Sequence, residues 1–316
     1  MKFAVCTLFE KHYHFGVAVL VNSLIKKGFK GDVYVGYRGD LPQWTEMAVS
    51  NTSLNWTGAS TLEVNGDVNI HFLPVEIDYQ FTNYKPYFML ELFAGICSDC
   101  EGVAYFDPDI VVKATWKFFE TWMAHGVALV HEIISNDMPP NHPIRKEWEK
   151  VIQKSGRTTT RNMYSYINAG FFAVSKKHIE FVQIYKEMIE LGRSHFNLEP
   201  TNFQFTASRE DLFFAKDQDA LNIAAMCSES PLSEMGPEGM DFIHGGFTMS
   251  HAVGGAKPWK KNFISSALSG IAPTLADKNF WANVYGPIKP YSNGQIKIKK
   301  IAIATSSLIS RFYVKN

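Results

Sequence analysis

The sequence has no excess of charge of either sign, because its 31 Lys and Arg residues balance 31 Asp and Glu residues over 316 positions. Proteins that bind nucleic acids through phosphate contacts need a basic surface, so this balance argues against that class of partner. The sequence also lacks a run of about 18 apolar residues, which excludes a transmembrane helix. Hydrophobic residues make up 46% of the chain and charged residues 20%, which excludes a disordered protein. A folded chain of this length forms two domains or one large α/β domain.

Cysteine is scarce too: the chain has four, at Cys6, Cys97, Cys100 and Cys227, too few for a disulfide scaffold of this length. Cys97 and Cys100 form a Cys-x-x-Cys pair, but a structural zinc site needs four ligands and no second pair supplies them. We therefore expect ordinary cysteines at the end of a helix.

Residues 1–6 lack the apolar core and cleavage site of a signal peptide, so we expect a cytoplasmic protein.

Apolar residues alternate between strand-like runs and helix-like spacing. Residues 3–8 and 32–37 predict strands, and residues 15–27 predict the helix between them. This order is a βαβ unit with parallel strands, so the loop after the first strand lies at the sheet edge where open α/β sheets bind ligands. Further strands are expected at 69–74, 102–106, 127–131 and 166–174, helices at 86–97, 177–191 and 217–226, and a long irregular loop at 135–165.

The glycine-rich motifs of dinucleotide-binding and P-loop proteins are absent. Instead, the carboxylates of Asp107-Pro108-Asp109 directly follow the strand at 102–106. Two carboxylates at a strand end can hold Mg²⁺ or Mn²⁺, with substrate phosphates completing the shell. His251 can add an imidazole ligand, which shifts the preference toward Mn²⁺. Gly254 allows a phosphate to approach the backbone, and Lys257 can neutralise a diphosphate.

These segments resemble those of the family 8 glycosyltransferases of the GT-A fold, the group of glycogenin and the bacterial lipopolysaccharide galactosyl- and glucosyltransferases. The family pattern His-x-x-Gly-x-x-Lys-Pro-Trp is intact from His251 to Trp259. Phe106-Asp-Pro-Asp109 resembles the family's Asp-x-Asp motif, and Asn168-Ala-Gly170 resembles its donor-sugar segment. Residues 216–222 resemble its Asp-Gln-Asp helix start, and Lys85 lies where the family has a basic residue that contacts the nucleotide.

The resemblance implies an α/β GT-A fold, with a Rossmann-like, mixed and mainly parallel central sheet flanked by helices. We expect a glycosyltransferase domain over residues 1–265, divided into a nucleotide-binding half at about 1–112 and a donor-sugar and acceptor half at about 113–265. Residues 266–316 form a C-terminal extension. The implied reaction is metal-dependent transfer of a hexosyl unit from a nucleotide-sugar, with UDP as the nucleotide, to a glycan or glycolipid acceptor. Retention of anomeric configuration and a place in polysaccharide or lipopolysaccharide biosynthesis are implied as well.

The resemblance also implies individual roles. Asp107, Asp109 and His251 are expected to hold Mn²⁺, with Mg²⁺ as an alternative. Gln218 would face the anomeric carbon. The complete catalytic set is Asp217, Gln218 and Asp219. The donor-binding set is Thr7, Phe9, Lys85, Phe106, Asp107, Asn168, Ala169, Gly170, Gly254 and Lys257.

Two departures from the family affect the donor site. The first strand carries Cys6-Thr7-Leu8-Phe9 where the family has an acidic residue that reads uracil, so Thr7 and Phe9 are the remaining candidates for contacting the base. The family's carboxylate for the sugar hydroxyls has no clear match. Glu132 or Asp137 can serve, and the alternative for each is a solvated loop acid.

The last segment differs in composition from the rest of the chain. Residues 286–316 contain no acid, and their six Lys and Arg residues are interleaved with apolar ones. This composition suits peripheral contact with the inner face of an anionic membrane. The alternative is a terminal strand and helix packed on the domain, with a solvated basic face.

Two other functions stay open. One is a noncatalytic module that binds nucleotides or sugars. The other is a sugar nucleotidyltransferase, although that class requires a glycine-rich, arginine-containing loop that residues 9–13 do not provide. Loops at 135–165 and 191–215 are the candidates for binding an acceptor.

Overall fold

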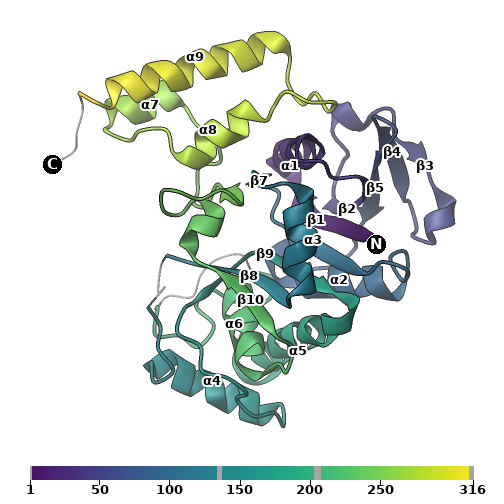
Figure 1. Cartoon of the computed structure of the whole chain (residues 1–316), viewed down its shortest axis with the longest axis vertical. Coiled ribbons are helices and arrows are strands. Elements are labelled where there is room, and N and C mark those ends of the chain that lie inside the picture. The colour runs from purple at the N-terminus through teal and green to yellow at the C-terminus, as the bar shows by residue number, and fades with distance from the viewer. Residues whose placement is uncertain (1, 134–136, 203–207, 313–316) are drawn as a thin grey trace.

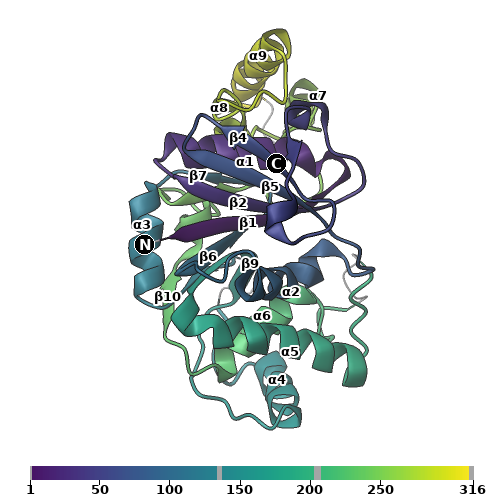
Figure 2. The same cartoon turned by 90° about the vertical axis from the view of Figure 1, so that its right-hand side faces the viewer.

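The computed structural model describes residues 2–133, 137–202 and 208–312. Within them, nine strands form one central sheet in the order β10-β8-β9-β6-β1-β2-β5-β4-β3 (Figures 1 and 2). The strands are β1 (Phe3–Glu10), β2 (Gly31–Arg38), β3 (Val49–Ser50), β4 (Ser60–Val64), β5 (Val68–Pro74), β6 (Gly102–Phe106), β8 (Val127–His131), β9 (Ile167–Ser175) and β10 (Leu232–Met235). The expected α/β class and mixed sheet are confirmed.

The sheet is less parallel than expected. The central strands β6, β1, β2 and β5 are parallel to one another, and β8 is parallel to β10. The strand β9 runs antiparallel to both β6 and β8, and β4 runs antiparallel to both β3 and β5. Because β9 enters the sheet in the opposite direction, its first residues lie at the edge where β6 ends.

Helices cover both faces of the sheet. The described helices are α1 (His14–Lys26), α2 (Phe81–Ala94), α3 (Trp116–Ala124), α4 (Pro143–Lys154), α5 (Ile179–His195), α6 (Asp217–Cys227), α7 (Phe263–Leu268), α8 (Leu275–Ala282) and α9 (Asn293–Ile309). Alternate residues of β1 face opposite cores: Cys6 and Leu8 pack with α2, α5 and α6, whereas Val5 and Phe9 pack with α1 and α3. The sheet is therefore buried on both sides, and ligands reach it at its edges.

Three expectations about local structure were wrong. The helix expected at 86–97 begins at Phe81, so that Pro86 lies inside it. The loop expected at 135–165 contains α4, which begins at Pro143, a residue type favoured in the first helical turn. This helix is mostly polar and buries one narrow face through Trp148, Val151 and Ile152, which is why its apolar pattern is weak. Cys97 and Cys100 are joined in a disulfide at the end of α2.

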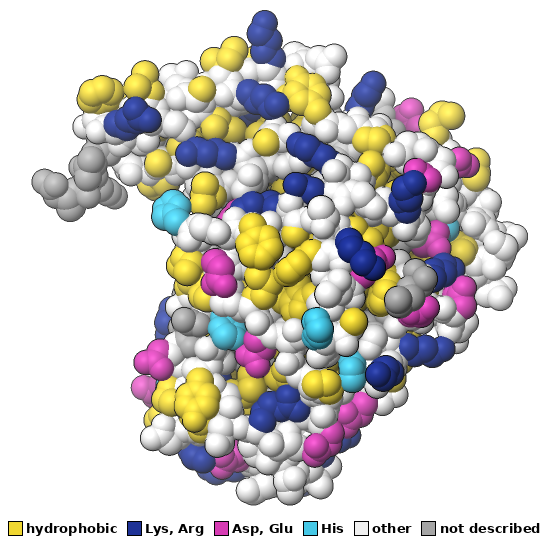
Figure 3. Space-filling model, in the orientation of Figure 1, with side chains coloured by type: hydrophobic (Ala, Val, Ile, Leu, Met, Phe, Trp, Pro, Cys, Tyr) yellow, Lys and Arg dark blue, Asp and Glu magenta, His cyan; other side chains and the backbone are white. Residues whose placement is uncertain are grey.

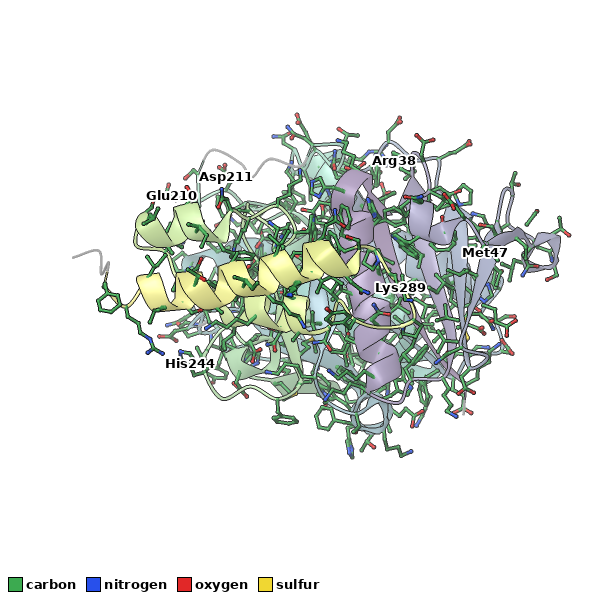
Figure 4. All side chains as sticks on the ribbon, turned by 90° about the horizontal axis from the view of Figure 1, so that it is seen from above. Arg38, Met47, Glu210, Asp211, His244 and Lys289 are labelled. Atoms are coloured by element: carbon green, nitrogen blue, oxygen red, sulfur yellow. A yellow bond between two sulfur atoms is a disulfide. The ribbon has the colours of Figure 1, made fainter. Side chains whose placement is uncertain are left out.

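The C-terminal extension is described up to residue 312, and the helix of its basic segment is α9, which is preceded by irregular chain at 286–292. Its helix α9 packs with α7 and α8 in a layer beyond α1, seen at the top of Figure 1 and from above in Figure 4. Asn22 of α1 fixes this layer, because its side chain donates to Ile288 O at 2.9 Å and accepts from Ile288 N–H at 3.1 Å. The strand that we considered for this segment is not present in its described residues. No described helix has the length and apolar character needed to cross a membrane.

Candidate active site

A second, small sheet brings the predicted metal ligands together. After β6, Asp107 and Asp109 lead directly into β7 (Ile110–Val112), which pairs antiparallel with β11 (Met249–His251). In this pairing Ile110 is opposite His251, and Ala252 N–H donates to Asp109 O at 3.1 Å. Two distant segments of the chain thus meet at the carboxyl edge of the central sheet.

The three side chains form a compact group. One ligand atom from each of Asp107, Asp109 and His251 lies within 4.8 Å of the other two. The His251 Nε2 atom is 3.3 Å from Asp109 Oδ1 and 3.9 Å from Asp107 Oδ2, and among the described residues the buried Nδ1 atom has no hydrogen-bond partner. Gly170 packs against the ring, and a Cβ there would lie 2.3 Å from His251 Cε1. Two carboxylates and an imidazole, held in place in this way, fit a divalent cation of the Mn²⁺ type.

Lys257 contributes a positive charge to the same group. Its Nζ atom donates to Asp109 Oδ2 at 2.6 Å and to Ala252 O at 2.9 Å. Burial alone would raise the pKa of Asp109, but the charges and hydrogen bonds of His251 and Lys257 outweigh burial and lower it. Asp109 is therefore ionised near neutral pH. Residues 253–256, between His251 and Lys257, are exposed, and Gly254 has a φ of +95°, which favours glycine.

Lys85 links the candidate metal ligands Asp107, Asp109 and His251, called the metal group below, to the predicted sugar site. Its ammonium lies 3.2 Å from Asp107 Oδ1 and 3.1 Å from Asp217 Oδ2, and it donates to Ala169 O at 2.9 Å. Burial opposes the charge of Lys85, but the two acids raise its pKa overall. The pKa of Asp217 is raised by burial, although Lys85 acts in the opposite direction. Lys85 of α2 therefore ties together the end of β6, the first residues of β9 and the start of α6.

The predicted sugar segment at the start of β9 is fixed by side chains from two other elements. Asn168 Oδ1 accepts from Gly170 N–H at 2.8 Å, and Asn168 Nδ2 donates to Glu132 Oε2 at 2.5 Å. Ala169 N–H donates to Gln218 Oε1 at 3.0 Å. Of the two acids left open by the sequence, Glu132 is buried at this site, whereas Asp137 is exposed.

Asp219 lies deeper than the other two members of its motif. Its carboxylate accepts from Tyr166 Oη at 2.6 Å and from Ala215 N–H at 2.7 Å. Burial raises the pKa of Asp219 to about 7, despite these hydrogen bonds. Because both oxygens are engaged inside the protein, Asp219 fixes the start of α6 rather than facing a substrate.

Three residues of the predicted donor set are in the core. Thr7, Phe9 and Phe106 are at most 1% exposed, and Phe9 stacks on Tyr37 at a ring distance of 5.9 Å. Their burial leaves no side-chain surface for a nucleotide, which corrects the expectation that they contact the donor. The helix α1 covers the face of β1 that carries Thr7 and Phe9, and Phe119 of α3 packs against Phe106.

Two rings after β1 lie close to the metal group and were missed in the sequence. His12 stacks on Tyr13 at 4.8 Å, and the Lys257 ammonium is 5.9 Å from the centre of the Tyr13 ring. Trp259 Nε1 donates to His12 Nδ1 at 2.9 Å, so the loop after β1 is tied to the segment that carries Lys257. The run of rings His12-Tyr13-His14-Phe15 behind the first strand is the signal that could have found them.

Comparisons with known proteins are informative at the level of structure. No protein-family model matches the chain, and no curated protein matches it by sequence. Among solved structures, 94% of this chain is similar to the WbbM bifunctional glycosyltransferase, with a TM-score of 0.55 and 16% identity. The chain therefore has an α/β fold of the GT-A type, with a mixed central sheet flanked by helices.

Two further structures extend this result. The galactosyltransferase LgtC, solved with donor and acceptor sugar analogues, matches over 94% of this chain and 99% of its own, with a TM-score of 0.52 and 14% identity. The glycosyltransferase GlyE of Streptococcus pneumoniae matches over 97% of this chain, with a TM-score of 0.51 and 13% identity. This chain spans 51% of the WbbM chain and 64% of the GlyE chain. At these identities the likeness establishes the fold.

Proposed function

We propose that this protein is a metal-dependent glycosyltransferase that moves a hexosyl unit from a UDP-sugar to a hydroxyl group of a glycan or glycolipid. The observation that carries the proposal is the grouping of Asp107, Asp109 and His251 within 4.8 Å, at the carboxyl edge of the sheet. Open α/β sheets bind their ligands at this edge. The glycosyltransferase fold of the chain supports the same reaction.

Asp107, Asp109 and His251 would hold the divalent cation, which when bound supplies positive charge that stabilises the departing diphosphate. Lys257 extends toward the same place and donates charge-assisted hydrogen bonds to diphosphate oxygens. The exposed backbone at Gly254, without a side chain, lets the diphosphate approach closely. The half-buried ring of Tyr13 offers an apolar surface for the base beside Lys257.

The sugar lies against Asn168, Asp217 and Gln218 in this proposal. Gln218 carries a neutral amide, which is a poor nucleophile, so a covalent glycosyl-enzyme is disfavoured. We propose instead that the acceptor oxygen bonds to the anomeric carbon on the face from which the diphosphate leaves. The bond from that carbon to the diphosphate oxygen breaks, and the acceptor proton passes to the departing oxygen. This path retains the anomeric configuration.

A hydrolysis assay tests the proposal without knowledge of the acceptor. We expect Mn²⁺-dependent release of hexose from a UDP-hexose, measured for UDP-glucose and UDP-galactose. Asp109→Asn should lower the rate by at least about 100-fold, because it removes a charged metal ligand. Asp277→Asn is the matched control: Asp277 is equally buried and also pairs with a lysine, Lys261 at 2.8 Å, outside the site. Unchanged Mn²⁺-dependent turnover in Asp109→Asn would contradict the metal assignment.

We propose further that α9 contacts an anionic membrane surface. Ile298, Ile301 and Leu308 share one face of α9 by their spacing and are 68%, 56% and 55% exposed. Figure 3 shows hydrophobic and basic side chains mixed over the layer of α7–α9, with few acidic ones. Co-sedimentation with vesicles of phosphatidylglycerol, compared with phosphatidylcholine alone, tests this contact. Lys297→Glu combined with Lys300→Glu should abolish anionic binding, and equal binding to both vesicle types would contradict it.

A further inference from the structure

A polar groove lies beside the proposed active site and has no role in the reaction described above. Its volume is about 640 Å³, within the range of ligand-binding pockets. The loop before α2 forms one wall through Asp78 and Tyr79, the last turn of α5 contributes Arg193, and residues 197–201 form the opposite wall. Arg38, labelled in Figure 4, donates to Ile77 O at 2.5 Å and to Tyr79 O at 2.8 Å and so fixes the first wall.

The groove is joined to the proposed active site by short connections. Pro200 O accepts from Asn83 Nδ2 at 3.0 Å, in the first turn of the helix that carries Lys85. Glu199 O accepts from Lys216 Nζ at 3.2 Å, and Lys216 directly precedes Asp217. The wall formed by residues 197–201 is therefore held by α2 and by the start of α6, the two elements that place Lys85 and Asp217 in the site.

The groove offers hydrogen-bonding groups of both kinds. Asp78, Asn197 and Glu199 have exposed side chains without a hydrogen-bond or ion-pair partner among the described residues. Arg193 lies over the Tyr79 ring at 5.9 Å and donates to the Tyr79 hydroxyl. Carboxylates accept hydrogen bonds from hydroxyl groups, whereas the guanidinium and the amide can donate to them.

The charge of the lining selects among ligand classes. The carboxylates of Asp78 and Glu199 and the guanidinium of Arg193 line the groove, and the cations of Arg38 and Lys216 bind backbone oxygens of its walls. Arg193 also pairs with Glu190 at 3.6 Å, so charges of the two signs are balanced around the groove. A phosphate or another anion therefore gains no net attraction from the lining. A neutral molecule with many hydroxyl groups satisfies the lining best.

We infer that this groove binds a neutral oligosaccharide segment of the acceptor, beyond the sugar that receives the transferred unit. The inference rests on the proposed function, because it takes the reaction centre to lie at Asp217 and Lys85. A saccharide chain that enters along the groove meets Glu199 and Asp78 first. The wall at Glu199 is tied by Lys216 to the start of α6, where the reaction is proposed to occur. Affinity for the acceptor should accordingly increase with the length of the saccharide.

Binding to an array of neutral oligosaccharides of two to six hexose units, with the monosaccharides as reference, tests the inference. Asp78→Ala combined with Glu199→Ala should weaken binding of the best oligosaccharide by about 10-fold or more, since two exposed acceptors are lost. Glu63→Ala combined with Asp67→Ala is the control, because these exposed acids lie on the β4–β5 hairpin at the opposite end of β5. Each protein is also titrated with UDP and Mn²⁺.

The outcomes separate the inference from the proposed function. Length-dependent oligosaccharide binding that only the Asp78 and Glu199 variant loses, with UDP binding unchanged, supports the groove as a saccharide site. The inference is overturned if the natural sequence binds UDP and Mn²⁺ but no oligosaccharide, or if the variant binds oligosaccharide as tightly as the control. Absence of UDP binding in every protein contradicts the proposed function instead, and the oligosaccharide result then still decides the groove.

Discussion

Replacing Lys257 by Met should change the affinities for metal and for diphosphate in opposite directions. The Lys257 ammonium lies 2.6 Å from Asp109 Oδ2, so a positive charge already occupies one oxygen of a proposed metal ligand. A divalent cation has to compete with this ammonium for Asp109. A diphosphate, by contrast, gains the ammonium as a donor once Asp109 releases it. Metal and diphosphate should therefore each raise the affinity for the other.

The magnitude follows from the burial of the ion pair. The side chains of Lys257 and Asp109 are 12% and 4% exposed, so water screens their interaction little. A hydrogen bond between charged groups contributes about 1.5–3 kcal/mol, which corresponds to about 10- to 100-fold in affinity. Lys257→Met should raise the affinity for metal by this factor, because the competing charge is gone. It should lower the affinity for diphosphate by a similar factor, because a donor is lost.

Calorimetric titration measures both affinities directly. Mn²⁺ is titrated into the metal-free protein, and UDP is then titrated at saturating Mn²⁺. Lys261→Met is the matched control, since it breaks another buried ion pair, with Asp277 at 2.8 Å, that lies outside the site. The control should behave as the natural sequence in both titrations. An affinity for Mn²⁺ that is unchanged or lower in Lys257→Met would refute the competition for Asp109.

Three further predictions concern positioning and stability. Gly170→Ala should weaken Mn²⁺ binding by about 10- to 100-fold in the same titration, because its Cβ would lie 2.3 Å from His251 Cε1 and displace the ring. An unchanged affinity for Mn²⁺ would show that metal binding does not depend on the position of the His251 ring. Asp219 has a pKa of about 7 in the folded protein against an ordinary 3.8, so the folded state binds the extra proton between these values. The free energy of unfolding of the natural protein, measured in urea, should therefore fall by on the order of 4 kcal/mol relative to that of Asp219→Asn as the pH rises through that window. A difference in free energy between the two proteins that stays constant from about pH 5 to 8 would contradict this. Asn22→Ala should lower the free energy of unfolding in urea by about 3 kcal/mol, because Ile288 loses both buried hydrogen bonds. A decrease of less than about 1 kcal/mol would mean that α1 does not fix the C-terminal layer.

The strands that carry the site could be predicted because they are short apolar runs with abrupt polar ends. The strand at 102–106 was expected with the bounds that β6 has, and the polar residues after it placed Asp107 and Asp109 at the sheet edge. The pairing of β7 with β11 was not predictable, because each strand has only three residues. The sequence could therefore suggest His251 as a ligand only through its motif, and the strand register supplied the physical reason.

Burial and long-range charge pairing were the harder properties to predict. Thr7 and Phe9 alternate with Cys6 and Leu8, but the sequence does not show that helices cover both faces of β1. Lys85 was expected to meet the nucleotide from its place in the sequence, and the position of its ammonium between Asp107 and Asp217, which are distant in sequence, was not foreseen. Only the folded chain shows which acids approach a buried lysine.

The central claim is that the edge of the sheet at Asp107, Asp109 and His251 binds a nucleoside diphosphate together with a divalent cation. Thermal unfolding with UDP, ADP, GDP and CDP, each with and without Mn²⁺, tests it most directly. A ligand at 100 times its Kd stabilises the folded protein by about 2.7 kcal/mol, which raises the Tm by several degrees. The account predicts that the Tm rises when UDP and Mn²⁺ are both present, and that Asp109→Asn abolishes the rise. A Tm unchanged by every diphosphate with Mn²⁺, or raised equally in Asp109→Asn, would contradict it.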